Sequence, residues 1–159
     1  MAQHTQQTNK SSEKYIIPSR LLVGAPDLTA QAAIELMQHA LCTQKGCKSC
    51  TTCQAIARQE HHAVMWLHPE KTYTREQFEP VTHALSFARE YDDPYFIVIT
   101  YADFLTTACA NSLLKALEEP PIGYQFILLA HRLDQLLPTI RSRCVISTIA
   151  GASIITLHE

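Results

Sequence analysis

The chain has 159 residues, of which 47% are hydrophobic and 18% are charged, and its net charge is −2 at neutral pH. This length suits one α/β domain with its own core and is too short for two ordinary domains. The charge balance excludes a global basic field for nucleic acid, and no apolar run approaches the ~20 residues of a membrane span. Residues 1–14 are expected to form a disordered tail without a signal peptide's apolar core, which favours a cytoplasmic location.

Strands and helices are expected to alternate along the rest of the chain. The apolar run Arg20–Gly24 predicts a strand, and Asp27 is placed to cap a helix over about residues 28–41. Beyond a cysteine-rich segment, the patterns predict a short helix at 54–58, a strand at 63–67, a helix from the capping box Thr74-x-x-Gln77 to about 89, a strand at 95–100, a helix at 106–118, a strand at 124–130, a short helix at 134–140 and a last strand at 144–147.

The strand at 95–100 is continuously apolar and rich in β-branched residues, which is typical of a parallel strand covered on both faces. Five strands that alternate with helices predict a three-layer αβα sandwich around a mostly parallel five-stranded sheet.

The cysteine-rich segment places four thiols within twelve residues, at Cys42, Cys47, Cys50 and Cys53. Two Cys-x-x-Cys steps that share Cys50 bring several sulfurs within reach of one ion, and four thiolates match the closed tetrahedral shell of a structural zinc site. Gly46 allows a sharp turn, and Lys45 and Lys48 are expected to offset the negative charge of such a centre. The sequence therefore predicts an inserted zinc module at 42–53.

Two other uses of these cysteines are less favoured. Two disulfides would suit a secreted protein, but no signal peptide precedes them. A thioredoxin-like redox pair follows a strand and opens a helix, whereas this segment follows a predicted helix. The isolated Cys109 and Cys144 lie in apolar sequence and are interpreted as small buried hydrophobes.

Three stretches carry a resemblance to a known family: residues 46–56, residues 110–121 with the sequence ANSLLKALEEPP, and residues 136–144 with the sequence LLPTIRSRC. Together they resemble the N-terminal AAA+ module of bacterial DNA polymerase III clamp-loader subunits, either delta-prime or gamma/tau, over about Ser19 to Ser147. The resemblance implies an AAA+-type P-loop fold over residues 15–150. It also implies a helical lid and collar, which the C-terminal extension 151–159 is too short to contain.

The places that should hold ATP depart from the family pattern. Where an ATP-hydrolysing member carries G-x-x-x-x-G-K-[ST], residues 24–31 read GAPDLTAQ, a degenerate loop that keeps Gly24, introduces Asp27 and has Thr29 near its end. The lysine is missing, and Asp27 would repel a triphosphate. After the central strand, Asp103 alone remains of an Asp-Glu-Ala-Asp-like motif. ATP is therefore not expected to bind, and delta-prime is the closer match.

Arg143 matches the family's arginine finger, which reaches a neighbouring subunit's ATP; Arg141 is the less favoured candidate. The alternative is an arginine that only caps a helix C-terminus. In the helix at 106–118, Asn111, Lys115 and Glu118 share a polar face that offers interface contacts or an ordinary solvated stripe.

The resemblance implies a non-hydrolysing, delta-prime-like subunit of DNA polymerase III that supplies Arg143 to a neighbouring ATPase during sliding-clamp loading. Its expected cofactor is structural zinc. Its expected partners are the other clamp-loader subunits and, through the complex, the sliding clamp and primed DNA. Two alternatives remain: an active gamma/tau-type ATPase, and a zinc-stabilised, AAA+-shaped interaction module without a role in replication.

Overall fold

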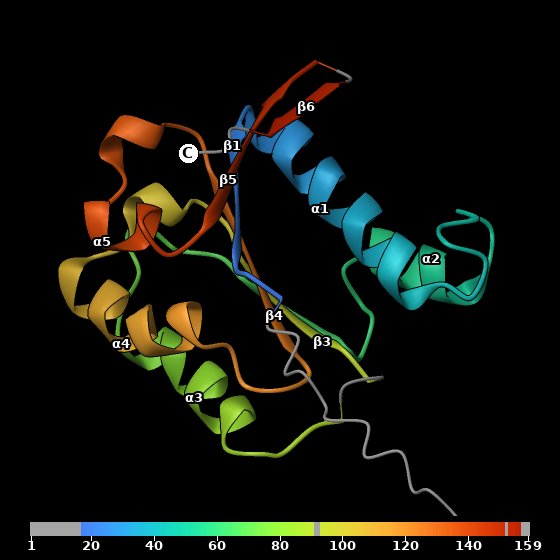
Figure 1. Cartoon of the computed structure of the whole chain (residues 1–159), viewed down its shortest axis with the longest axis horizontal. Helices are drawn as coiled ribbons and strands as arrows, with labels where there is room; N and C mark the ends of the chain where they lie inside the picture. Colours follow the sequence, from blue (N-terminus) through green and yellow to red (C-terminus); the bar gives the residue numbers. More distant parts are fainter. Residues whose placement is uncertain (1–16, 91–92, 152, 157–159) are drawn as a thin grey trace, which may run out of the picture.

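One six-stranded sheet forms the centre of the computed structural model, which describes residues 17–90, 93–151 and 153–156 (Figure 1). Its strand order is β2-β3-β4-β1-β5-β6. The first five in this order run parallel, and β6 is antiparallel to β5. The strands are β1 (Arg20–Gly24), β2 (Val64–Leu67), β3 (Tyr95–Ile99), β4 (Tyr124–Ala130), β5 (Val145–Ala150) and β6 (Ser153–Thr156).

Helices cover both faces of the sheet, which confirms the predicted three-layer architecture. One face carries α1 (Pro26–Leu41) and α2 (Thr51–Ala57). The other carries α3 (Glu79–Leu85), α4 (Thr107–Glu118) and α5 (Pro138–Arg141) (Figure 1). Short 3-10 turns at Glu76–Phe78, Ala102–Phe104 and Leu133–Gln135 lie in the connections.

The core consists of two apolar layers, one on each side of the sheet. In β3, Ile97 and Ile99 belong to the layer that contains Leu113 of α4. The alternate β3 residue Val98 belongs to the other layer, with Met37 of α1. Successive side chains of a strand point to opposite faces, so β3 has to be apolar at nearly every position. This explains the continuous hydrophobic run that predicted it.

Three predicted helices differ from the observed ones. The short helix expected at 134–140 is a 3-10 turn at Leu133–Gln135 followed by α5. Asp27 does not cap α1: the helix begins at Pro26, and the N-cap is Ala25, whose side chain makes no capping hydrogen bond. Proline suits the first helical position because its missing N–H has no partner there in any helix. The helix predicted from 74 to about 89 is shorter, because α3 ends at Leu85. Half of its capping box is present, since the Thr74 N–H donates to Gln77 Oε1 at 2.9 Å.

The C-terminal part also contains more regular structure than predicted. The strand expected at 144–147 continues to Ala150, and the chain returns along it as β6, so a sixth, antiparallel strand joins the five parallel ones. Gly151 makes the turn with a φ of 64°, a conformation that glycine adopts without steric cost. The tail predicted at 1–14 lies outside the described residues. None of the helices in the described ranges has both the length and the apolar character that crossing a membrane requires.

Candidate functional site

The sulfur atoms of the four clustered cysteines converge on one point. All four Sγ atoms lie within 4.8 Å of one another. The Cys42 Sγ is 3.7 Å from that of Cys47 and 3.8 Å from that of Cys50. A tetrahedral zinc ion with Zn–S bonds of about 2.3 Å requires sulfurs about 3.8 Å apart. These cysteines, Cys42 included, could therefore hold a metal ion with the geometry of zinc.

Disulfides do not explain the cluster, because all six cysteines are free thiols. The sulfur separations are far longer than the ~2.05 Å of a disulfide bond. The two isolated cysteines behave as interpreted: Cys109 is buried in the core, and Cys144 packs against it. Burial raises the pKa of the Cys144 thiol to about 12.

Local backbone geometry turns the sulfurs inward. Gly46 has a φ of 92°, which confirms the sharp turn predicted there. Cys50 is the N-cap of α2 and accepts the Cys53 N–H at 3.3 Å, and Cys47 accepts the Cys50 N–H at 3.4 Å. The second Cys-x-x-Cys step therefore opens a helix, although the cluster as a whole follows α1. Lys48 makes its ion pair with Glu35 of α1 at 3.1 Å.

The cysteines differ in how readily they ionise. The Ser49 hydroxyl, followed by the N–H groups of Ser49 and Cys50, lowers the pKa of Cys47 to about 6. Backbone N–H groups of Cys47 and Gly46 lower the pKa of Cys42. Burial raises the pKa of Cys53 to about 12. Hydrogen-bond donors around the sulfurs of Cys42 and Cys47 thus favour the thiolate form, which is the form that binds a metal.

The connection from β1 to α1 is one residue long. Strand β1 ends at Gly24 and α1 begins at Pro26, so only Ala25 lies between them. Pro26 has no backbone N–H to offer, and Asp27 places an exposed carboxylate in the first helical turn. The buried Thr29 donates its hydroxyl proton to the Pro26 carbonyl at 3.0 Å. A phosphate loop instead wraps an anion with several free backbone N–H groups.

Gly24 is explained by packing against the neighbouring strand. A Cβ atom at this position would lie 2.5 Å from the carbonyl oxygen of Ile149, which pairs with Gly24 across β1 and β5. The one glycine kept from the family pattern therefore has a role in the sheet.

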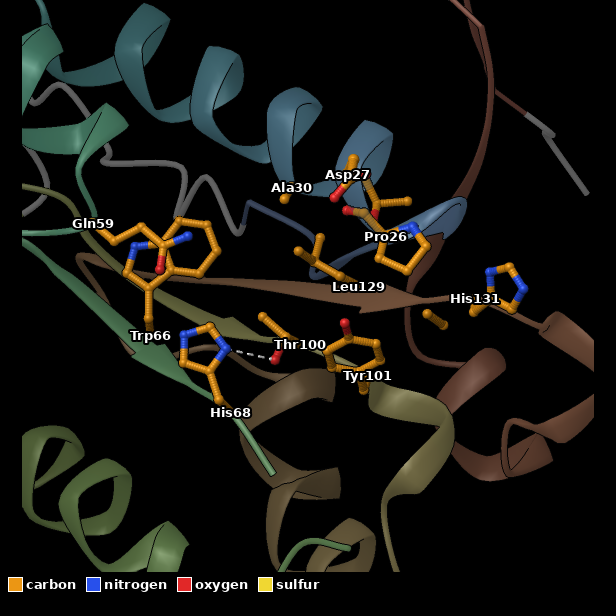
Figure 2. Close-up of a pocket in the computed structure, with 12 residues that line it drawn as sticks. Pro26, Asp27, Ala30, Gln59, Trp66, His68, Thr100, Tyr101, Leu129 and His131 are labelled. Atoms are coloured by element: carbon orange, nitrogen blue, oxygen red, sulfur yellow. Dashed lines mark hydrogen bonds between the residues drawn. The ribbon is translucent and has the colours of Figure 1, made fainter. Parts of the chain in front are cut away.

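A pocket of about 160 Å³ lies at the carboxyl ends of β1 to β4 (Figure 2). Its walls include Asp27, Trp66, His68, Thr100 and Tyr101, and the indole of Trp66 lies nearly parallel to the imidazole of His68. Among these five, Asp27 alone is a predicted site residue. The others could have been found from their positions, because ligands of open α/β sheets bind beyond the carboxyl ends of the strands.

Hydrogen bonds fix the polar groups of this pocket. The Thr100 hydroxyl donates to the Leu67 carbonyl at 3.0 Å, and His68 Nδ1 lies 3.0 Å from the same hydroxyl oxygen (Figure 2). Since the hydroxyl has a single proton, Nδ1 is the donor to Thr100. Asp103, the remaining acidic residue of the family motif, accepts the His131 N–H at 3.4 Å. The remaining carboxylate after the central strand therefore contacts the backbone just beyond β4.

Arg143 lies just before the amino end of β5, at the end of the strands opposite to the pocket. Its Nε donates to Glu118 Oε2 at 3.0 Å, and its Nη1 donates to the Thr139 carbonyl of α5 at 3.1 Å. The second contact is a helix-capping one, which is the alternative role to an arginine finger. Glu118, predicted to offer an interface contact or to belong to a solvated polar face, is the ion-pair partner of Arg143. Arg141 is exposed on α5.

The strand order and layers define an AAA+-like α/β domain. Of the solved structures that resemble the chain, a gamma subunit-related DNA polymerase III protein from Thermotoga maritima aligns with a TM-score of 0.65 at 20% identity, over 87% of this chain and 43% of that one. The Holliday junction branch migration motor RuvB of the same organism aligns with a TM-score of 0.51 at 15% identity, over 84% and 37%. At such low identities these likenesses show the fold alone.

Sequence comparison gives the family. The model described as "DNA polymerase III, delta subunit" matches residues 1–153, and the chain belongs to this family. The DNA polymerase III subunit delta' of Escherichia coli K12 is 35% identical over 132 residues, covering 78% of this chain and 40% of that protein. The subunit delta' of Bacillus subtilis 168 is 29% identical over 140 residues, covering 86% and 41%. The chain thus spans less than half the length of these relatives.

Proposed function

We propose that this chain is a delta-prime-like clamp-loader module that binds no ATP and supplies Arg143 to the ATP held by a neighbouring subunit. Its partners are the other subunits of the loader and, through the complex, the sliding clamp and primed DNA. The observation that carries this proposal is the one-residue connection between β1 and α1. Such a connection has no length of backbone with which to surround a phosphate.

Four further features support the absence of ATP. Pro26 removes a donor from the helix N-terminus, which is where phosphates bind in related folds. The exposed Asp27 would repel the anion. No lysine occupies the position where the family pattern places one, because this part of the sequence reads LTAQ. Fewer acidic side chains are also available to bind magnesium, since Asp103 is the single acidic residue of the segment after the central strand.

The position of Arg143 supports action on another subunit. The register of β1 with β5 pairs Arg20 with Val145 at one end and Gly24 with Ile149 at the other. The five-residue strand β1 therefore separates the two ends by about 13 Å, at about 3.3 Å per residue. Arg143 precedes Val145 and lies beyond the end opposite to the pocket. A guanidinium there could contact only a nucleotide bound elsewhere.

The proposal also includes a structural zinc site formed by Cys42, Cys47, Cys50 and Cys53. Its sulfur spacing suits a closed tetrahedral shell, in which every position is taken by protein. Such a site stabilises the segment between α1 and α2 and has no open position for a substrate. The zinc would therefore have a structural role.

The test is the ATP turnover of a loader reconstituted from this subunit and its partner subunits, with clamp and primed DNA. An arginine finger contributes about 10³–10⁵-fold to turnover at its own ATP site. Because a loader has several ATP sites, we expect Arg143→Ala to remove the turnover of one of them. The matched control is Arg141→Ala, which removes an exposed arginine at the end of α5, two positions before Arg143. Turnover unchanged by Arg143→Ala, with the assembly intact, would remove the finger role.

A further inference from the structure

Glu118 and Arg143 come from elements far apart in the sequence and meet near the amino end of β5. Glu118 is the last residue of α4, and Arg143 follows α5. The Arg143 side chain is 29% exposed and that of Glu118 is 62% exposed. An open surface hollow of about 490 Å³ is lined by both residues, so the guanidinium faces space that a neighbouring subunit can enter.

Hydrogen bonds engage two of the three guanidinium nitrogens of Arg143. Nε donates to Glu118 at 3.0 Å, and Nη1 donates to the Thr139 carbonyl at 3.1 Å. A guanidinium carries five N–H groups in a fixed plane. Within the described part of the chain, Nη2 makes no hydrogen bond, so this nitrogen can donate to an incoming anion.

We propose that Glu118 is a positioning residue for Arg143: it holds Nε, fixes the plane of the guanidinium, and leaves Nη2 directed toward the phosphates of the neighbour's ATP. The inference rests on the proposed function, because it assumes that Arg143 acts on such a nucleotide. Its physical basis is preorganisation. An unrestrained arginine has many rotamers and loses that freedom on contact, whereas a restrained one has lost it already.

The charge of Glu118 makes this role distinguishable from simple affinity. A carboxylate beside Arg143 cancels part of its positive charge and disfavours an approaching triphosphate. Glu118 therefore does not strengthen nucleotide binding. Its effect is on orientation, which acts on kcat more than on KM. An ion pair this exposed contributes little to folding, so removing it should leave the fold intact.

The test compares Glu118→Ala with Glu118→Gln in the reconstituted loader, measuring kcat and KM for ATP with clamp and primed DNA. The glutamine oxygen can still accept the Nε–H but carries no charge. We expect Glu118→Ala to lower the kcat of the affected site about tenfold with KM within about twofold, and Glu118→Gln to keep kcat within about twofold. Glu119→Ala, which removes the adjacent exposed carboxylate, is the control and should match the unmodified loader.

A double variant separates this inference from the proposed function. In an Arg143→Ala background, Glu118→Ala should have no further effect on kcat, and the thermal unfolding midpoint of each variant subunit should equal that of the parent. If Arg143→Ala lowers turnover but Glu118→Ala does not, the positioning role is wrong and the finger stands. If Glu118→Gln is as defective as Glu118→Ala, the hydrogen bond is not what matters and the inference fails. If Arg143→Ala itself has no effect, the proposed function fails first.

Discussion

The side-chain amide of Gln38 donates a hydrogen bond to the backbone carbonyl of Cys53 at 2.9 Å. Gln38 is a buried polar residue of α1, and Cys53 lies in the first turn of α2. This bond joins the cysteine cluster to the sheet-covering helix independently of any metal. Ile56 of α2 adds an apolar contact, since it is fully buried in the layer that contains Met37. The cluster is thus packed onto the domain.

Gln38→Ala is predicted to destabilise the protein. It removes a buried donor and leaves space in the interface between α1 and α2, which should lower the free energy of unfolding by about 1–2 kcal/mol. The matched control is Gln54→Ala, because Gln54 donates to the Ser49 carbonyl at 3.0 Å on the surface. We expect that exposed bond to contribute less than about 0.5 kcal/mol. Urea unfolding of both variants measures the difference, and equal losses would contradict a special role for Gln38.

Removal of the metal is predicted to loosen the segment between α1 and α2 before the sheet unfolds. Purified protein should contain one zinc ion per chain by elemental analysis, and a strong chelator should lower its thermal midpoint because the metal stabilises only the folded state. Cys47→Ser should abolish the bound zinc, whereas Cys144→Ala, outside the cluster, should retain it. Zinc retained in full after Cys47→Ser would show that this sulfur is not a ligand.

Gly24→Ala is predicted to cost stability for a reason unrelated to nucleotide. The new Cβ would lie 2.5 Å from the Ile149 carbonyl, so the two strands would have to shift, at a cost of about 1–3 kcal/mol.

At the adjacent Ala25, an N-cap without a side-chain hydrogen bond, serine should instead stabilise the protein by about 0.5–1 kcal/mol. Thermal unfolding with and without Mg-ATP measures both variants. A Gly24→Ala effect that appears only with ATP present would contradict the packing explanation.

The sheet could be predicted from the sequence because its strands carry strong local signals. The run at Tyr95–Ile99 is apolar at every position, and the alternation of strands and helices indicates parallel pairing. The cysteine cluster could be predicted equally well, since the short spacing of the cysteines along the chain determines which sulfurs can meet. Strand β6 was not, because its pairing with β5 depends on a turn at Gly151 rather than on an apolar pattern.

Contacts between distant segments could not be predicted. Glu118 and Arg143 are 25 positions apart, and nothing in either local sequence indicates their ion pair. The same holds for Ser19, whose buried hydroxyl donates to the Leu117 carbonyl at 2.9 Å. Asp27 was misassigned as a cap because its residue type suits that role, whereas proline at position 26 starts the helix earlier. Such details follow from the packing of the elements.

The most direct test of the account is a calorimetric titration of this protein with Mg-ATP, with an ATP-hydrolysing loader subunit as the positive control. The one-residue connection at Ala25 predicts no saturable binding up to about 1 mM ATP, a concentration at which even a weak site of about −4 kcal/mol would be half filled. A stoichiometric transition with a micromolar dissociation constant would contradict the central claim.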